Sequence, residues 1–350
     1  VLVMVRAGSN YETKENNGIS HFLEHMIFKG TEKRPTTLQI AEGLDSIGGE
    51  YNAFTSKEWT GYYAKADSKH LPIVVDIITD IFQNALLDPT EMEREKLVIL
   101  EEMNMYQDTP IKFVDELAEE LLYGDQPQGW KIIGEQDIVK AITRKDLMRY
   151  FKEKYTKENT SIIVAGAIPG PQRLAKLLDA HFAKFSRAGA ARAKEVREQQ
   201  SAPRVLVHCK ETDQTHLSFA LRAYKHRSKN LPALKILNIL LGGNMSSRLF
   251  INIREREGLG YYINSHIESY TGCGYLSVKA GIDNDRAFRG IELILKELRS
   301  MRDGAITKDE LHKAKEYVQG KLALSLETSD AQAFWLGSSI AQGGKIKTPE

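Results

Sequence analysis

Three side chains near the start of the sequence, His21, Glu24 and His25, have the types and the spacing that metal chemistry needs. Residues four apart on a helix lie on one face, so the two imidazoles can reach a single ion. Neutral imidazole is a good ligand for zinc, and Glu24 lies on nearly the same face, where it can touch a metal-bound water. The order H-x-x-E-H reverses the common H-E-x-x-H zinc motif, so this segment predicts a zinc site with a carboxylate beside it.

A catalytic zinc ion needs a third protein ligand and an open position for water, and segment 88–107 offers carboxylates for that role. Five residues of this segment fall on one stripe at helical spacing: Glu95, Val98, Ile99, Glu102 and Tyr106. The apolar middle of the stripe predicts that it faces the core, where a carboxylate is costly unless it is paired or binds a metal. We therefore expect Glu102 to be the third ligand and Glu95 to accept a hydrogen bond from an imidazole N–H. Glu101 competes with Glu102, because periodicity alone does not exclude it.

Three other interpretations of these residues remain open at this point. Two histidines on a buried helix also occur as hydrogen-bonded core residues without a metal. A protein that binds metal without hydrolysis would keep both imidazoles, and a non-catalytic subunit of a larger assembly would keep the fold. The presence of Glu24 favours an enzyme, because a subunit without catalysis does not need a general base.

The composition argues against several kinds of partner. The chain has 350 residues, 48 of them basic and 47 acidic, for a formal net charge of +1. No strong field follows from this balance, so we expect neither nucleic acid nor a membrane surface as a partner. The sequence has no run of 18 apolar residues, and a transmembrane helix is therefore not expected. The two cysteines, Cys209 and Cys273, lack metal-type spacing and are expected to be reduced thiols.

Hydrophobic periodicity and turn signals predict strands and helices along the whole chain. In the first half, strands are expected at 1–6, 50–66 and 160–165, and helices at 18–28, 37–47, 70–86, 88–107 and onward to about 155. In the second half, strands are expected at 204–208, 215–222 and 261–282, and helices at 231–241, 247–255, 285–301 and from 307. Because the second half repeats the order of the first, the two halves are expected to be related.

Segment 186–203 is small, charged and weakly apolar, which predicts a linker. We therefore expect an α+β fold of two related domains, each a mainly antiparallel sheet with helices packed on one face. The zinc-binding catalytic domain is expected at 1–185 and a substrate-holding domain of similar fold at 204–350. The chain begins inside an apolar run without a methionine and ends without closing an element, so the second domain is expected to be truncated at its end.

Three longer segments resemble the M16 peptidases, the family of insulinase and the mitochondrial processing peptidase. They are residues 18–31 (GISHFLEHMIFKGT), 48–55 (GGEYNAFT) and 98–110 (VILEEMNMYQDTP). The resemblance spans essentially the whole chain and is greatest to the short, two-domain bacterial-type branch. It implies that the two histidines and a later glutamate bind zinc and that Glu24 is the general base. The family has a second glutamate seven residues before the ligand, which favours Glu102, since Glu95 precedes it by seven and Arg94 precedes Glu101.

The resemblance also implies residues that hold the substrate. Arg254 and Tyr261 match an arginine and a tyrosine seven residues apart, which in the family approach the zinc from the other half of a clamshell. Asn52, Ala53 and Phe54 would form a docking edge, to which an extended peptide adds as another strand. The implied enzyme is a zinc metalloendopeptidase with one Zn²⁺ per chain, acting on peptides or unfolded polypeptides.

The resemblance further implies partners and a compartment. In two-domain members the other half of the clamshell is a second chain, and some members divide the site between an active and an inactive subunit. This chain keeps both sets of residues, which favours a homodimer, with a heterodimer of related subunits as the alternative. The expected compartment is the bacterial cytoplasm, with the mitochondrial matrix and the periplasm as alternatives.

Overall fold

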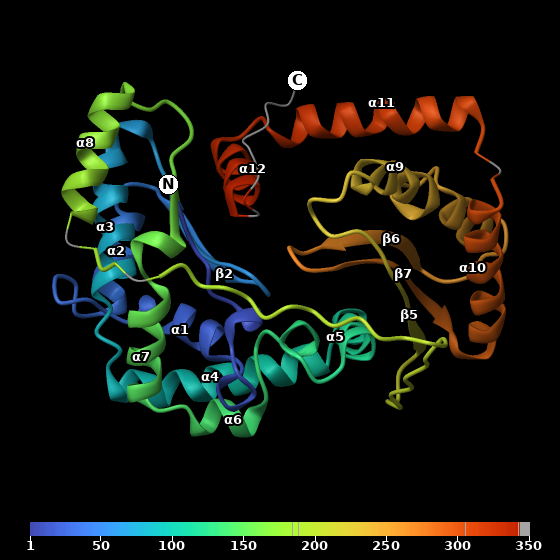
Figure 1. Cartoon of the computed structure of the whole chain (residues 1–350), viewed down its shortest axis with the longest axis horizontal. Helices are drawn as coiled ribbons and strands as arrows, with labels where there is room; N and C mark the ends of the chain where they lie inside the picture. Colours follow the sequence, from blue (N-terminus) through green and yellow to red (C-terminus); the bar gives the residue numbers. More distant parts are fainter. Residues whose placement is uncertain (184, 188, 305, 342, 344–350) are drawn as a thin grey trace. The chain divides into compact units, whose positions relative to one another are not determined.

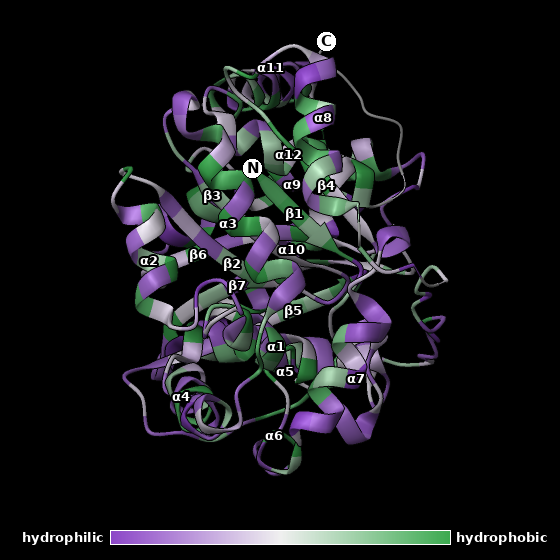
Figure 2. Ribbon diagram, turned by 90° about the vertical axis from the view of Figure 1, so that its left-hand side faces the viewer, coloured by the Kyte–Doolittle hydropathy of each residue, from purple (hydrophilic) through white to green (hydrophobic). Residues whose placement is uncertain are grey.

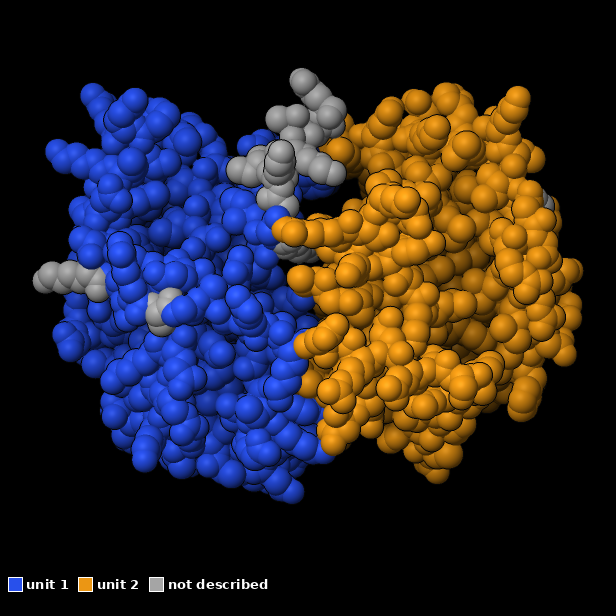
Figure 3. All heavy atoms as spheres, in the orientation of Figure 1, with its two compact units in different colours: residues 1–104, 130–194, 325–350 blue, residues 105–129, 195–324 orange. Residues whose placement is uncertain are grey.

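The computed structural model describes residues 1–183, 185–187, 189–304, 306–341 and 343 (Figure 1). The chain divides into two compact units, which Figure 3 distinguishes by colour. Unit 1 contains residues 1–104, 130–194 and 325–350, and unit 2 contains residues 105–129 and 195–324. The boundaries expected from composition, at 185 and 204, treat each domain as one continuous stretch and stay a prediction. Segment 105–129, from the expected first domain, belongs to compact unit 2. Segment 325–350, from the expected second domain, belongs to compact unit 1.

Unit 1 is built on a four-stranded antiparallel sheet with the strand order β2-β3-β1-β4. Its strands are β1 (Leu2–Val5), β2 (Glu50–Thr55), β3 (Thr60–Lys65) and β4 (Thr160–Ile163). Successive side chains alternate between the two faces. The ring of Tyr62 packs beside Phe82 on one face, and the ring of Tyr63 packs against Phe334 on the other. Figure 2 shows hydrophobic residues along β1, whose four residues are all buried.

The helices of unit 1 cover both faces of this sheet. They are α1 (Ile19–Ile27), α2 (Thr37–Asp45), α3 (Leu71–Asn84), α4 (Pro89–Gln107), α6 (Gln136–Ala141), α7 (Arg144–Lys154), α8 (Pro171–Phe182) and α12 (Ser329–Ala341), with short helices η1 (Ser9–Tyr11), η2 (Lys14–Asn16), η3 (Ser68–His70) and η5 (Lys157–Asn159). Helices α1 and α3 pack on β3, whereas α12 packs on β1 and β4. Helix α4 starts where the sequence indicates, because the carboxylate of Asp88 accepts hydrogen bonds from the backbone N–H groups of Thr90 and Glu91.

Unit 2 is built on a three-stranded antiparallel sheet with the order β5-β7-β6. Its elements are α5 (Pro110–Tyr123), η4 (Pro127–Gly129), β5 (Gln214–Arg222), α9 (Leu231–Gly242), the π-helix η6 (Phe250–Glu255), β6 (Tyr262–Ser269), β7 (Gly274–Asp283), η7 (Asn284–Arg286), α10 (Ala287–Arg302) and α11 (Lys308–Ser325). Leu241, Ile253, Val278 and Ile294 form the centre of its core. The predicted fold class, two α+β units with mainly antiparallel sheets, is confirmed. The expected packing of helices on one face differs in unit 1, where α12 also covers the second face of the sheet.

The strand predicted at 204–208 is wrong. These residues form no strand and are exposed, with 85% of the surface of Val205 and 78% of that of Val207 accessible. An apolar run becomes a strand only when a neighbouring strand pairs with it, and no described strand pairs with this one. Within the described part of the chain, no helix combines the length and the apolar character needed to cross a membrane.

Candidate metal centre

Helix α1 separates apolar from polar side chains. Its fully buried apolar residues include Ile19, Phe22, Leu23 and Met26. Their spacing by three and four residues places them on one stripe, which anchors the helix to the core of unit 1. His21, Glu24 and His25 lie on the remaining face and are partly exposed. The structure therefore contains the predicted helix, and its three polar residues lie on one side of it, as expected.

The N-terminus of α1 is fixed by a buried carboxylate. Glu12 is 1% exposed and accepts hydrogen bonds from the backbone N–H groups of Gly18 and Ser20, at 2.8 and 2.9 Å, and from the amide of Asn17 at 2.9 Å. Gly18 has a φ of 95°, and a Cβ there would lie 2.6 Å from the carbonyl oxygen of Ile133. These contacts fix the start of the short helix that carries the histidines, and sequence reasoning had assigned Glu12 no role.

Helix α4 brings carboxylates to the same place. Its buried stripe consists of Met92, Glu95, Ile99 and Met103. Glu95 is 5% exposed, and Glu102 is half-buried at one side of this stripe. The prediction that the whole stripe from Glu95 to Tyr106 faces the core is wrong at Val98, which is 49% exposed. The buried side of α4 is narrower than the sequence indicated, and Val98 falls outside it.

Three possible metal ligands converge between α1 and α4. The Nε2 atoms of His21 and His25 each lie 3.5 Å from Oε2 of Glu102, and donor atoms of the three side chains all lie within 4.8 Å of one another. Tetrahedral zinc with bonds of about 2.0–2.2 Å places neighbouring donor atoms about 3.4 Å apart. The donor types and their spacing therefore fit zinc. Glu101 is exposed and does not belong to this cluster.

Hydrogen bonds orient one imidazole more firmly than the other. Nδ1 of His25 lies 3.0 Å from Oε2 of Glu95, whose other oxygen lies 2.5 Å from the ammonium of Lys29. With Nδ1 used in this way, Nε2 of His25 is left to face the cluster. Nδ1 of His21 is buried and has no hydrogen-bond partner among the described residues. Lys29 is a second residue that sequence reasoning missed, because its contact with Glu95 depends on the packing of α1 on α4.

The two histidines differ in their affinity for a proton. Burial, together with the nearby charge of His25, lowers the pKa of His21 to about 4. Burial also disfavours the charged form of His25, but its hydrogen bonds with Glu102 and Glu95 outweigh that effect and raise its pKa to about 9. One imidazole is therefore neutral at pH 7, and the other takes a positive charge beside the carboxylates. A metal cation would supply positive charge at the same place.

Glu24 lies beside the cluster without belonging to it. Its Oε2 accepts a hydrogen bond of 2.5 Å from the hydroxyl of Thr55, the last residue of β2. Burial raises the pKa of Glu24 above its usual range. Thr55 closes the segment 48–55 that resembles the M16 pattern, yet sequence reasoning gave it no role. The alternation along β2 could have found it, because Thr55 shares a face with Tyr51, whose ring stacks on Phe28 just beyond α1.

The predicted docking residues lie on β2, an edge strand of the sheet. Asn52 is exposed, and its side-chain oxygen accepts a hydrogen bond from the N–H of Ala53 at 2.8 Å. The ring of Phe54 packs 5.6 Å from that of Phe334 and covers Gly61. Phe54 therefore contributes to the sheet's packing, while the backbone on the open side of β2 has no strand beside it in the described structure.

The remaining two candidates belong to unit 2. Arg254 lies in the π-helix η6, and its guanidinium is 4.6 Å from the ring centre of Phe250. Tyr261 directly precedes β6 and is 81% exposed. The structure thus brings together His21, His25 and Glu102 within unit 1, and it holds the arginine and the tyrosine on one short segment of unit 2.

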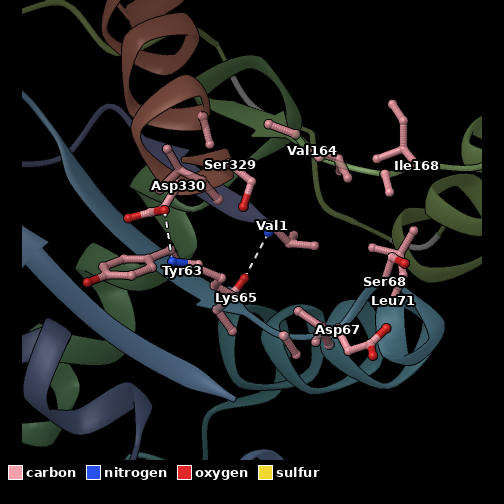
Figure 4. Close-up of a pocket in the computed structure, with 18 of the residues that line it drawn as sticks. Val1, Tyr63, Lys65, Asp67, Ser68, Leu71, Val164, Ile168, Ser329 and Asp330 are labelled. Atoms are coloured by element: carbon pink, nitrogen blue, oxygen red, sulfur yellow. Dashed lines mark hydrogen bonds and ion pairs between the residues drawn. The ribbon is translucent and has the colours of Figure 1, made fainter. Parts of the chain in front are cut away.

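A separate cavity of about 390 Å³ lies at the far end of β3 in unit 1 (Figure 4). At its wall the Val1 ammonium donates a hydrogen bond to the carbonyl oxygen of Ala64, and Lys65 forms an ion pair with Asp330 at 3.1 Å. None of the cluster's ligands lines this cavity. The cavity and the candidate metal centre are therefore different places in unit 1.

Comparisons with known sequences match both halves of the chain. The family profile described as "Insulinase (Peptidase family M16)" matches residues 1–136, and that described as "Peptidase M16 inactive domain" matches residues 141–318. The "Uncharacterized zinc protease YmxG" of Bacillus subtilis is 36% identical over 99% of this chain and 83% of its own length. The "Uncharacterized zinc protease Rv2782c" of Mycobacterium tuberculosis is 34% identical over 99% of this chain and 80% of its own length.

Solved structures share the fold. A protease from Helicobacter pylori superposes with a TM-score of 0.92 at 24% identity, covering 98% of this chain and 83% of the other. A structure from Pseudomonas fluorescens, described as a peptidase M16 inactive domain, gives a TM-score of 0.87 at 17% identity over 99% of this chain and 83% of the other. At these identities the likeness concerns the arrangement of strands and helices.

Proposed function

The chain belongs to the insulinase family of peptidases, M16, and we propose that it is a zinc metalloendopeptidase that cleaves peptides or unfolded polypeptides. The observation that carries this proposal is the convergence of His21, His25 and Glu102, with Glu24 beside them. Its relatives are named zinc proteases. The described residues hold no second cluster of this kind, so the site belongs to unit 1.

Each residue of the site has a role in this proposal. His21, His25 and Glu102 would hold one zinc ion, and Glu95 would orient His25. A bound zinc ion polarises a carbonyl group and lowers the pKa of a water molecule to about 7. Glu24 accepts the proton of the attacking water and passes it to the leaving amine. The raised pKa of Glu24 suits this exchange, because a base that must also donate works best near the ambient pH.

The substrate would bind as an added strand. Strand β2 is an edge strand whose end, Thr55, touches the base, so a peptide paired with β2 would pass the metal centre. Asn52 and Ala53 would offer main-chain and amide groups, while Phe54 supports the strand from the other side. We further propose that Tyr261 and Arg254 stabilise the substrate carbonyl, in keeping with the family resemblance.

Cleavage of a quenched fluorescent peptide library, measured together with zinc content, tests the function. Wild type should contain one zinc per chain and cleave, whereas Glu24→Gln should keep the zinc and lose cleavage. Glu93→Gln, which removes an exposed carboxylate from α4, serves as the control and should cleave like wild type. Zinc without cleavage in the wild type would instead favour a non-catalytic subunit. Equal cleavage by Glu24→Gln would refute the assigned base.

We propose a homodimer as the functional form, because one chain carries both the metal ligands and the Arg254–Tyr261 segment. Sedimentation of the purified chain would decide between one copy and two. A bacterial cytoplasmic location is proposed with it, supported by the bacterial origin of the relatives.

A further inference from the structure

We propose that Thr55 is a positioning residue, which holds the carboxylate of Glu24 and ties it to the edge strand β2. Thr55 would serve the same reaction as Glu24, so its role rests on the proposed function. The strand that would receive the substrate and the base that would act on it are then joined by one side chain. Pairing of a peptide with β2 would steady the base as well as place the scissile bond.

The first observation is the contact itself. The hydroxyl of Thr55 donates a 2.5 Å hydrogen bond to Oε2 of Glu24. Among the described residues, no other hydrogen-bond donor is found for this carboxylate. A carboxylate on a short helix can rotate about its side-chain bonds, and a single strong hydrogen bond to a charged oxygen is enough to select one orientation. Thr55 is therefore the residue that sets the direction of the base.

The second observation is that Thr55 is itself held in place. It forms the last pair of the β2–β3 ladder with Thr60, whose hydroxyl lies 3.3 Å from its own. Thr60 is fully buried and donates its proton to the carbonyl oxygen of Ala7 at 3.1 Å. Thr55 also has one proton, and it goes to the charged Oε2 of Glu24, which at 2.5 Å is a nearer and stronger acceptor than the Thr60 hydroxyl at 3.3 Å. The β-branch further limits rotation of the Thr55 side chain.

The third observation is the position of Thr55 along β2. The turn that follows is closed by a 2.7 Å bond from the N–H of Ser56 to the carbonyl oxygen of Trp59, so this end of the strand is fixed. The outer edge of β2 has no neighbouring strand in the described structure. A peptide that pairs with this edge adds backbone hydrogen bonds to the strand that carries Thr55. The orientation of Glu24 would thereby depend on occupancy of the edge.

The kinetic consequence is specific. Thr55 touches the base and not the metal ligands, so its loss should leave zinc binding and substrate binding in place. In Thr55→Val, which keeps the shape and removes the hydroxyl, kcat should fall about 10–100-fold with KM unchanged. Thr55→Ser, which keeps the hydroxyl, should retain most of kcat. Thr79→Val serves as the control, because Thr79 is a buried threonine of α3 that bonds the carbonyl oxygen of Val75 and lies outside the site.

A measurement on the metal-free protein tests the contact without relying on cleavage. Thr55→Val, Glu24→Ala and the double variant form a thermodynamic cycle, read out as the midpoint of urea unfolding. If the hydroxyl and the carboxylate are coupled, Thr55→Val should lower the midpoint in the wild-type background and lower it less when Glu24 is already alanine.

The outcomes separate this role from the proposed function. Equal midpoint shifts in both backgrounds, or unchanged kcat in Thr55→Val with an active wild type, would overturn the role of Thr55. A drop in kcat that Thr55→Ser does not rescue would also overturn it, because the hydroxyl would not be the cause. A coupled cycle in a wild type that cleaves no peptide would refute the peptidase function and leave the contact established.

Discussion

Glu95 accepts the Nδ1 proton of His25 across 3.0 Å, a contact from α4 to α1 that decides which ring nitrogen faces the metal centre. An imidazole can bind a metal through either nitrogen, and a carboxylate on one of them selects the other. Glu95 is buried, so its own charge must be balanced. Lys29 does this at the second oxygen, 2.5 Å away.

Lys29 should therefore influence zinc affinity although it does not touch the metal ligands. In Lys29→Met the zinc dissociation constant should rise about tenfold, because Glu95 loses its cationic partner and holds His25 less firmly. Lys29→Arg should keep most of the affinity, since the positive charge remains. Competition with a chromophoric chelator measures both constants.

Lys33→Met is the matched control for Lys29. Lys33 also pairs with a carboxylate, that of Asp76 at 2.6 Å. Its side chain, however, is 58% exposed, and this ion pair involves no residue of α4. Exposed pairs contribute about 0–1 kcal/mol. An unchanged dissociation constant in Lys29→Met would show that Glu95 needs no cation to orient His25.

The two neighbouring glutamates of α4 should behave differently. Glu102→Gln should lose most bound zinc, because its oxygen is the one that meets both Nε2 atoms. Glu101→Gln should keep one zinc per chain, since Glu101 is exposed and outside the cluster. Metal content after dialysis checks both variants. Loss of zinc from Glu101→Gln alone would reverse the assignment.

Helical spacing was enough to predict which side chains share a face. It placed His21, Glu24 and His25 together on one helix and pointed to Glu95 and Glu102 on another. Periodicity alone could not decide whether Glu101 or Glu102 is the ligand, because both lie near apolar neighbours. It depends on how α4 packs against α1, a contact in which His21 meets Glu102 from 81 residues away in the chain.

The residues that sequence reasoning missed act across the fold. Glu12, Lys29 and Thr55 each meet the site through a contact that the local pattern does not encode. The strand predicted at 204–208 failed for a similar reason, because an apolar run reveals nothing about whether a partner strand is present. Local composition also gave no indication that segment 105–129 belongs to unit 2 and segment 325–350 to unit 1.

Glu12 should be important for stability because it satisfies the N-terminus of α1. Glu12→Gln replaces one acceptor oxygen by an amide that cannot accept the bonds from Gly18 or Ser20. The free energy of unfolding should fall by about 1–3 kcal/mol, the usual cost of leaving buried donors unpaired. Urea unfolding measures the change. Glu15→Gln, at an exposed position of the same loop, should have little effect, and an equal loss there would contradict the capping role.

Removal of the metal should loosen α1 and α4 and leave unit 2 unchanged. A ligand that binds the folded state stabilises it by about 2.7 kcal/mol when present at 100 times its dissociation constant. That stabilisation acts where the ligands lie, so backbone amides of α1 should exchange hydrogen faster after chelation, while those of β7 should not. Hydrogen exchange with and without a chelator measures this difference. His25→Ala is the control, because without this ligand chelation should change nothing. Faster exchange in β7 would place a metal site in unit 2, and a chelator effect in His25→Ala would mean that the ion is held by other residues.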